Sequence, residues 1–434
     1  MKLSKFQFIF FGIFFVFIIA GVIAFATFKS SSSTSALSAI TIWGTFPKDR
    51  FDQYVSKANQ SLTQPLSISY TEKDSDSFNR ELVQALARGT GPDAILISAD
   101  NLYPNLDKVV SIPYSVLNVR TFKDSYVEAG ELYMKADGIV GIPFTIDPLV
   151  MYWNRDTFAS AGLATYPRYW EDFGPIISKL TIKDNAQNIK KTAIALGDFT
   201  NVSNAREIFG SVLFQIGNPV TSFGINKDVL ETTIKNTVQE PSAQSVSDFF
   251  VQFVNPNNST YSWNRGMMND KSAFLGGYLS TYFGFASEIK DIASKNPNLN
   301  FDIAPLPQLK NGVKKAVYGK MYGFSILKAS QSQNAAYQIV SVLTSPQILK
   351  DLSDSLYLPS VRRDIISLGS NDPYISIFNT QALIAKTWLD SSPEDSRRLM
   401  FSMISSITSG AKKSKDAIRD FEDSYDIILR NAIQ

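Results

Sequence analysis

The chain has 434 residues, of which 44% are hydrophobic and 19% are charged, so it is long enough for two or three domains or lobes. Its 42 basic and 40 acidic residues give a formal net charge of +2, without the basic surplus that a nucleic-acid-binding surface needs. The sequence contains no Cys and no His, which excludes disulfides, Cys nucleophiles, Cys/His zinc sites and Ser-His-Asp triads. We expect neither a metal nor a cofactor.

A long apolar segment follows Lys2 and Lys5 at the N-terminus. Residues 6–28 carry no charged side chain, and about 20 apolar residues suffice to cross a bilayer as a helix. The two lysines favour a cytoplasmic N-terminus, with the remaining chain outside the cytoplasm. We interpret residues 1–28 as an uncleaved membrane anchor and the Ser-rich residues 29–38 as a tether. The alternative is a signal peptide, cleaved after its small-residue pattern, that yields a secreted protein.

The residues after the tether alternate between strand-like and helix-like patterns. Strands are predicted over 39–43, 66–71 and 93–98, and helices over 49–62 and 78–86. This alternation is typical of a mostly parallel sheet with helices on both faces. Such sheets bind ligands beyond the carboxyl ends of their strands, where Trp43 and Asp100 stand in this sequence.

An acidic residue interrupts the next predicted strand. The segment from Gly141 is apolar, like a strand buried on both faces, yet it contains Asp147, and Pro148 follows directly. A proline cannot donate a hydrogen bond to a sheet ladder. We therefore predict that the strand ends at Asp147 and that the chain leaves its sheet there.

The second half of the chain is more helical. From Pro148 to about residue 300 the pattern is rich in helix and in aromatic residues. Strands are predicted over 301–307 and 322–327, a helix is predicted over 334–343, and residues 381–434 are mostly helical.

Several segments occur in an order that resembles a known family. They are "ITIWGTF", "LARGTGPDAILIS", "GIPFTIDPLVMYWNRDTFASAGL", "YPRYWEDF", "MNDKSAFLGGYLSTY", "FDIAPLPQLKNG" and "KMYGFSILKASQSQNAAYQIVSVLTSPQ". Together they resemble the extracellular solute-binding proteins (family 1) of ABC-type carbohydrate importers, a group that includes the maltodextrin-binding proteins. The resemblance spans most of residues 38–434. The departure is the N-terminus, which lacks the lipobox cysteine of many relatives.

The resemblance implies an α/β, two-lobed periplasmic-binding-protein fold of type II, with a hinge between the lobes and the ligand in the cleft. The N-terminal lobe would comprise residues 39–147 with 304–352, and the C-terminal lobe 148–303 with 353–434. The chain would cross between lobes at about 146–148, 303–305 and 352–357. The implied function is that of a monomeric, non-enzymatic receptor that binds a sugar or oligosaccharide and delivers it to ABC permease subunits in the membrane.

A sugar site needs aromatic rings for the C–H faces of the ligand and polar groups for its hydroxyls. From strand ends and from the resemblance we select six ligand-binding candidates: Trp43, Asp100, Asp147, Tyr278, Tyr322 and Trp388. Four of them have a structural alternative. Trp43 could be a core residue, Asp100 a helix cap, Asp147 a brace for the hinge and Trp388 a packing residue of the C-terminal lobe.

Two other functions stay open at this point. The first is a surface glycosidase that uses Asp100 and Asp147 as its two carboxylates, which such enzymes hold about 5–10 Å apart. The second is a binding protein for a non-sugar solute such as a polyamine, which would need several clustered acids among aromatic residues.

Overall fold

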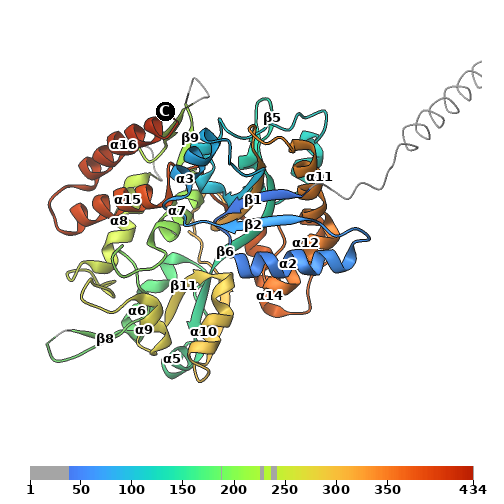
Figure 1. Cartoon of the computed structure of the whole chain (residues 1–434). Helices are drawn as coiled ribbons and strands as arrows, with labels where there is room; N and C mark the ends of the chain where they lie inside the picture. The colour runs from blue at the N-terminus through green and yellow to red at the C-terminus, as the bar shows by residue number, and fades with distance from the viewer. Residues whose placement is uncertain (1–38, 187, 225–228, 236–241, 434) are drawn as a thin grey trace, which may run out of the picture.

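The computed structural model describes residues 39–186, 188–224, 229–235 and 242–433 (Figure 1). An eight-stranded sheet runs through both halves of this part of the chain, in the order β11-β6-β13-β3-β1-β2, with β12 beside β6 and β14 beside β13. These strands are β1 (Ile40–Gly44), β2 (Ile68–Glu72), β3 (Ala94–Ser98), β6 (Ile142–Asn154), β11 (Thr281–Phe285), β12 (Phe301–Pro305), β13 (Val317–Ile326) and β14 (Ala385–Lys386).

The N-terminal part of the sheet has the predicted parallel arrangement. Strand β1 lies between β2 and β3 and is parallel to both. Ile42 and Leu96 are fully buried beneath α2 (Lys48–Ser61) and α3 (Phe78–Ala87), which contribute the buried faces that the sequence predicted, including Phe51 and Leu82. The carboxyl ends of β1 and β3 meet at one edge of the sheet.

The helices of the first lobe also include segments from late in the sequence. In Figure 1, α11 and α12, coloured orange and brown, lie on the same side of the molecule as α2, and α12 contacts α2. Besides α2 and α3, the helices of the first lobe are α4 (Val119–Ser125), α11 (Gln333–Leu343), α12 (Pro346–Leu356) and α13 (Arg363–Ile366). Residues far apart in sequence therefore build one lobe.

The second lobe surrounds the other end of β6. Its helices are α5 (Arg155–Ser160), α6 (Phe173–Leu180), α7 (Ala205–Gln215), α8 (Ala243–Val251), α9 (Asp270–Leu275), α10 (Ile289–Lys295), α15 (Pro393–Thr408) and α16 (Ser414–Asn431). Helix α14 (Pro373–Leu383) lies against β6 and β12. Three small hairpins complete the described strands, namely β4–β5 (Met134–Lys135, Gly138–Ile139), β7–β8 (Ile182–Lys183, Ile189–Lys191) and β9–β10 (Thr221–Phe223, Leu230–Thr232).

Strand β6 does not end at Asp147, so that prediction is wrong. The strand continues through Pro148 to Asn154. Its first half, up to Pro148, pairs with β13, and its second half lies between β11 and β12. Pro148 therefore stands where β6 changes its neighbours, and a missing N–H costs little at a break in the ladder. One continuous strand thus belongs to both lobes.

Strand β13 pairs with β3 of the first lobe and with the first half of β6. Strand β12 pairs along its whole length with the second-lobe half of β6. The loop after it stays with α7, because the Gln215 side chain donates to the carbonyls of Pro307 and Ala316. After α12, helix α13 contacts α4. The exact lobe boundaries stay a prediction.

The predicted anchor and tether, residues 1–38, lie outside the described residues. Among the helices that the structure does describe, none combines the length and the apolar character that a bilayer span requires.

Candidate functional site

Strands β6 and β13 present polar side chains where the two lobes meet. Alternate residues of a strand share a face, so Tyr318, Lys320 and Tyr322 lie on one face of β13. Asp147 of β6 stands opposite Lys320 in the antiparallel ladder, and opposite residues share a face. Lys320 Nζ lies 5.4 Å from the centroid of the Tyr322 ring. The strand pair thus offers acceptors, a cation and aromatic rings at the lobe boundary.

Asp147 is held by the second lobe. Its Oδ1 accepts a hydrogen bond of 3.0 Å from the backbone N–H of Ser287, in the short helix that follows β11. Burial raises the pKa of Asp147 to about 6, and the Ser287 hydrogen bond and the Lys320 charge offset only part of that effect. Asp147 is therefore a carboxylate that changes charge close to neutral pH.

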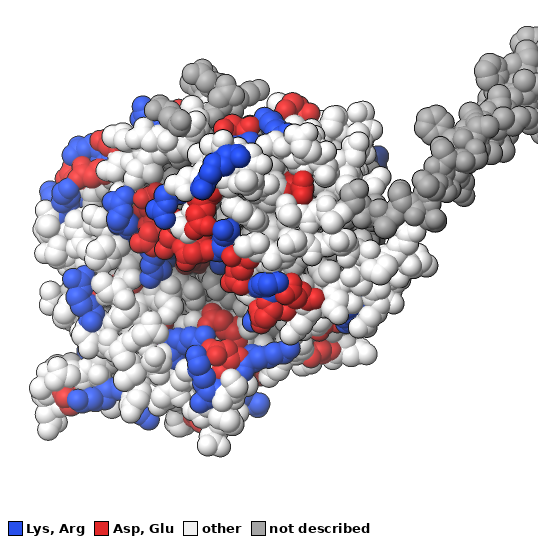
Figure 2. Space-filling model, in the orientation of Figure 1, with Lys and Arg blue, Asp and Glu red and all other residues white. Residues whose placement is uncertain are grey.

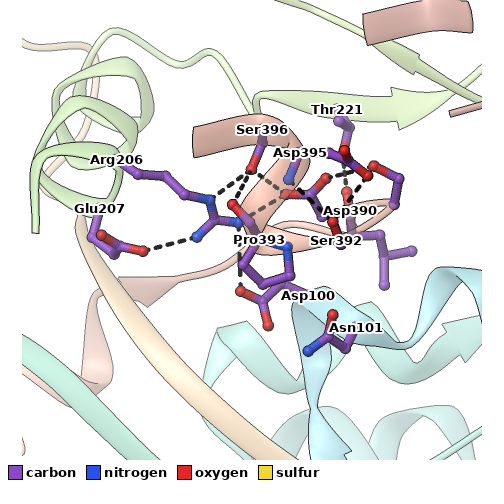
Figure 3. Close-up of polar contacts among 12 residues, drawn as sticks. Asp100, Asn101, Arg206, Glu207, Thr221, Asp390, Ser392, Pro393, Asp395 and Ser396 are labelled. Carbon is purple, nitrogen blue, oxygen red and sulfur yellow. Dashed lines mark hydrogen bonds and ion pairs between the residues drawn. The ribbon is translucent and has the colours of Figure 1, made fainter. Parts of the chain in front are cut away.

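Asp100 follows β3 and is buried between the lobes. Its Oδ2 accepts a hydrogen bond of 3.0 Å from the Tyr318 hydroxyl. The same oxygen lies 3.5 Å from Nη2 of Arg206 (Figure 3). Its Oδ1 is buried and has no hydrogen-bond partner among the described residues. A buried carboxylate oxygen without a donor is costly, so this atom calls for a hydrogen-bond donor that the described residues do not supply.

A buried arginine stands beside Asp100. Arg206 of α7 donates from Nη2 to Asp390 at 2.9 Å, from Nη1 to Glu207 at 3.0 Å and from Nε to Ser396 Oγ at 2.7 Å (Figure 3). Its guanidinium lies 4.0 Å from the centroid of the Trp388 ring. Burial alone would lower the pKa of Arg206, but Tyr318 and the surrounding carboxylates raise it above its ordinary value, so the side chain stays charged.

A cavity of about 380 Å³ opens next to this arginine and is lined by both lobes. Its lining residues are Ser75, Asp76, Asn79, Asn101, Arg206, Glu207, Ser392, Pro393, Glu394 and Arg397. Figure 2 shows acidic side chains gathered across the middle of the visible face. Within the described residues, no three His, Cys, Asp or Glu side chains are arranged to hold a metal ion. Apart from Pro393, the residues that line the cavity carry polar or charged side chains, which can hydrogen-bond to the hydroxyl groups of a ligand.

The structure brings three of the six predicted residues, Asp100, Asp147 and Tyr322, to β13. Tyr322 lies on this strand, Asp147 stands opposite its Lys320, and Asp100 accepts a hydrogen bond from its Tyr318. Trp43 is partly buried at the carboxyl end of β1, and Lys73 Nζ lies 4.1 Å from its ring centroid. Trp388 is fully buried below Arg206, with its ring 5.3 Å from that of Tyr318. Trp388 thus supports the site from behind and offers no open ring face in this structure.

Tyr278 lies away from the other candidates. It precedes β11, whose first residue, Thr281, pairs with Trp153 at the outer end of β6. Strand β11 has five residues. Its four residue-to-residue steps separate this end from the lobe boundary by roughly 13 Å. At the other end of the strand, Phe285 pairs with Leu149 and its ring lies 6.2 Å from that of Tyr318. The aromatic residue of β11 at the lobe boundary is therefore Phe285.

The sequence prediction missed several residues of this site. Phe285 and Ser287 follow or end a strand, as Trp43 and Asp100 do, so the same carboxyl-end rule could have found them. Lys320 alternates with Tyr322, which was a usable signal. Arg206 is a charged residue on the buried face of α7, at helical spacing from Phe209 and Gly210, but its ion-pair partners come from distant segments.

Comparisons with known proteins identify the class. The family model for the bacterial extracellular solute-binding proteins matches residues 48–349, more than half of the chain. The chain therefore belongs to this family, whose members are binding proteins and not enzymes, and the resemblance stated from the sequence is confirmed.

Individual relatives are more distant. The maltooligosaccharide ABC transporter solute-binding lipoprotein of Streptococcus pneumoniae is 24% identical over 386 residues, which cover 81% of this chain and 84% of the relative. Among solved structures, the cyclic α-maltosyl-1,6-maltose binding protein of Arthrobacter globiformis has a TM-score of 0.71 at 17% identity, covering 91% of this chain and 99% of that one. The sugar-binding protein MalE of Xanthomonas citri has a TM-score of 0.71 at 16% identity, covering 91% and 98%. These likenesses confirm the two-lobed α/β fold.

Proposed function

We propose that the protein is the extracytoplasmic substrate-binding component of an ABC transporter, and that it binds a sugar or oligosaccharide between its lobes. Membership of the solute-binding family supports this function. The function is also supported by the similarity to the Streptococcus pneumoniae relative, which is a maltooligosaccharide ABC transporter solute-binding lipoprotein. The observation that carries the proposal is the pair of carboxylates at the lobe boundary, of which Asp100 keeps one oxygen without a partner among the described residues.

The chemistry of the boundary suits a polyhydroxylated ligand. The carboxylates of Asp100 and Asp147 accept hydrogen bonds from hydroxyl protons, and Lys320 donates to hydroxyl oxygens. The rings of Tyr322 and Phe285 supply the apolar surface against which the C–H face of a sugar packs. Closure of the two lobes would then remove these groups from water, which strengthens each hydrogen bond.

A ligand screen on the full-length protein tests the proposal. Maltotriose, mannotriose, tagatose and spermidine are added separately, and the melting temperature is measured for each. We expect at least one sugar to raise the melting temperature, because a ligand that binds only the folded state stabilises it by mass action. Chromatography of the mixture should recover the sugar unchanged. A rise in the melting temperature with spermidine alone would contradict the proposal, and so would the appearance of a cleaved sugar.

We also propose that residues 1–28 anchor the protein in the cell membrane, with residues 29–38 as the tether and the described residues on the outer side. The uncharged segment 6–28 and the two preceding lysines support this topology. The full-length protein should remain in the membrane fraction after alkaline carbonate extraction, and protease outside the cell should remove most of the chain. A mature protein that begins after Ala26 and is released from cells would contradict it.

We propose further that the protein acts as a monomer which docks on the permease subunits of its transporter. The two-lobed, single-chain cleft supports this, because both lobes that line the cavity come from one chain. Light scattering of the purified protein should give the mass of one chain, 48.2 kDa, after the mass of any bound detergent is subtracted.

A further inference from the structure

One arginine connects the two lobes inside the boundary. Arg206 lies on α7 and pairs with Asp390, and both residues belong to the second lobe as its helices define it. Asp100 follows β3 in the first lobe, and its Oδ2 lies 3.5 Å from the same Nη2 that contacts Asp390. The backbone N–H of Asp390 also donates to the Asp100 carbonyl at 3.1 Å. All three residues are buried, so this contact excludes water.

The shape of the guanidinium explains how one side chain serves both lobes. Nε and Nη1 are held by Ser396 and Glu207, and the plane of the group lies over the Trp388 ring. These contacts are within the second lobe and keep the arginine fixed. Nη2 alone is shared between Asp390 and the first lobe. A lysine, with one nitrogen, cannot reproduce this forked arrangement.

The contacts of Arg206 also affect the orientation of the Asp100 carboxylate. Arg206 and the Tyr318 hydroxyl both engage Oδ2, which leaves Oδ1 as the free acceptor of a fixed carboxylate. When the lobes separate, Asp100 loses Arg206, and of its two partners only the Tyr318 hydroxyl of β13, a strand that pairs with β3, remains. The carboxylate is therefore held from both sides only while the lobes are together.

We propose that Arg206 is a positioning residue of the cleft, which joins Asp390 to Asp100 across the lobe boundary and thereby favours the closed form and orients Asp100 toward the ligand. Its effect on ligand binding rests on the proposed sugar-binding function. Its effect on lobe closure does not, and it can be measured without any ligand.

The test measures the distance between the lobes. The chain has no native Cys, so spin labels can be placed at the exposed residues Gln53 on α2 and Ser402 on α15 without removing other thiols. Pulsed electron-spin measurements on the full-length protein give the distance distribution with and without maltotriose. The variants are Arg206→Lys, Asp100→Asn and the double variant, which together form a cycle that isolates their coupling.

Asp270→Asn is the matched control. Asp270 is also a buried carboxylate, but its partners are Ser203 and Lys271 within the second lobe. We expect Arg206→Lys and Asp100→Asn each to shift the ligand-free distribution toward longer distances, the double variant to add nothing, and Asp270→Asn to keep the wild-type distances. Where the wild type binds maltotriose, either single variant should weaken binding about tenfold.

Asp100→Asn keeps the Arg206–Asp390 pair intact, so this variant tests the proposed contact between the lobes even if Arg206→Lys does not fold. Wild-type distances in Asp100→Asn, or fully additive effects in the double variant, would overturn the proposal. Absence of maltotriose binding by the wild type, with the expected distance shifts present, would count against the choice of sugar and leave the role of Arg206 supported.

Discussion

At the scale of single residues, Asp147 makes the site sensitive to pH. Its carboxyl has a pKa of about 3.9 in an unfolded chain, and burial raises it to about 6 in the folded protein. The folded state therefore holds this proton more tightly. The free energy of unfolding contributed by Asp147 is greatest below about pH 4, falls as the pH rises to about 6, and is constant above that.

Asp147→Asn should remove this dependence. At pH 7.5 the variant should be at least as stable as the wild type, by up to about 2–3 kcal/mol, because a buried charge is lost while Ser287 keeps an acceptor. Its affinity for the sugar identified by the ligand screen should fall about tenfold, since a charged acceptor is replaced by a neutral one. Calorimetric titration and thermal unfolding at pH 4.5 and 7.5 measure both, with Asp137→Asn at an exposed position as the control. Unchanged affinity with a lowered melting temperature would show that Asp147 only braces the hinge.

The residues that could be predicted from the sequence are those whose signal is local. Asp100 follows a strand, Asp147 interrupts an apolar run, and Tyr322 belongs to a strand-like segment, so each stands out within a few residues. Arg206 could not be recognised in this way, because its importance depends on Asp100 and Asp390, which are more than a hundred residues away on either side. The roles of the six candidates as ligand contacts stay a prediction.

At the scale of elements, the start of α14 depends on one cap. Asp372 accepts hydrogen bonds from the backbone N–H groups of Tyr374 at 2.8 Å and Ile375 at 3.2 Å, and its other oxygen accepts from the Tyr357 hydroxyl. Tyr357 ends α12 with a left-handed backbone, at φ 58°. The same carboxylate thus fixes the start of α14 and the end of α12.

Asp372→Ala should lower the free energy of unfolding by about 1–2 kcal/mol, because it removes an N-cap and a tyrosine acceptor. Asp372→Asn should lose less, since asparagine is also a good cap. Ser332→Ala is the control, because Ser332 stands at the N-cap of α11 without a side-chain capping bond. Urea unfolding of the three variants measures the difference. Equal losses in Asp372→Ala and Ser332→Ala would contradict this account.

The sequence predicts elements well where each has its own pattern. The predicted strands 39–43, 66–71 and 93–98 agree with β1, β2 and β3 to within two residues at each end. The error at Pro148 has a different origin. Whether a strand tolerates proline depends on which neighbours flank it, and those of β6 come from residues 281–326. A local pattern carries no information about such distant neighbours.

At the scale of the whole molecule, β6 and β13 join the lobes, and we expect the lobes to move about these strands when a ligand binds. Addition of the sugar that raises the melting temperature should reduce the radius of gyration in solution X-ray scattering, because the lobes approach each other. A sugar that leaves the melting temperature unchanged is the control. Binding without any change in the radius would show that the lobes are already together in the free protein.

The shared strands also determine the order in which the chain can fold during its synthesis and export. Strand β3 ends at Ser98, but β13, its neighbour on the side away from β1, begins only at Val317. Until β13 emerges, one edge of β3 has no partner from this sheet, and unpaired edges promote aggregation. Pairing over such a separation in sequence is also slow. The first lobe to be synthesised therefore becomes complete only after most of the second lobe has left the ribosome.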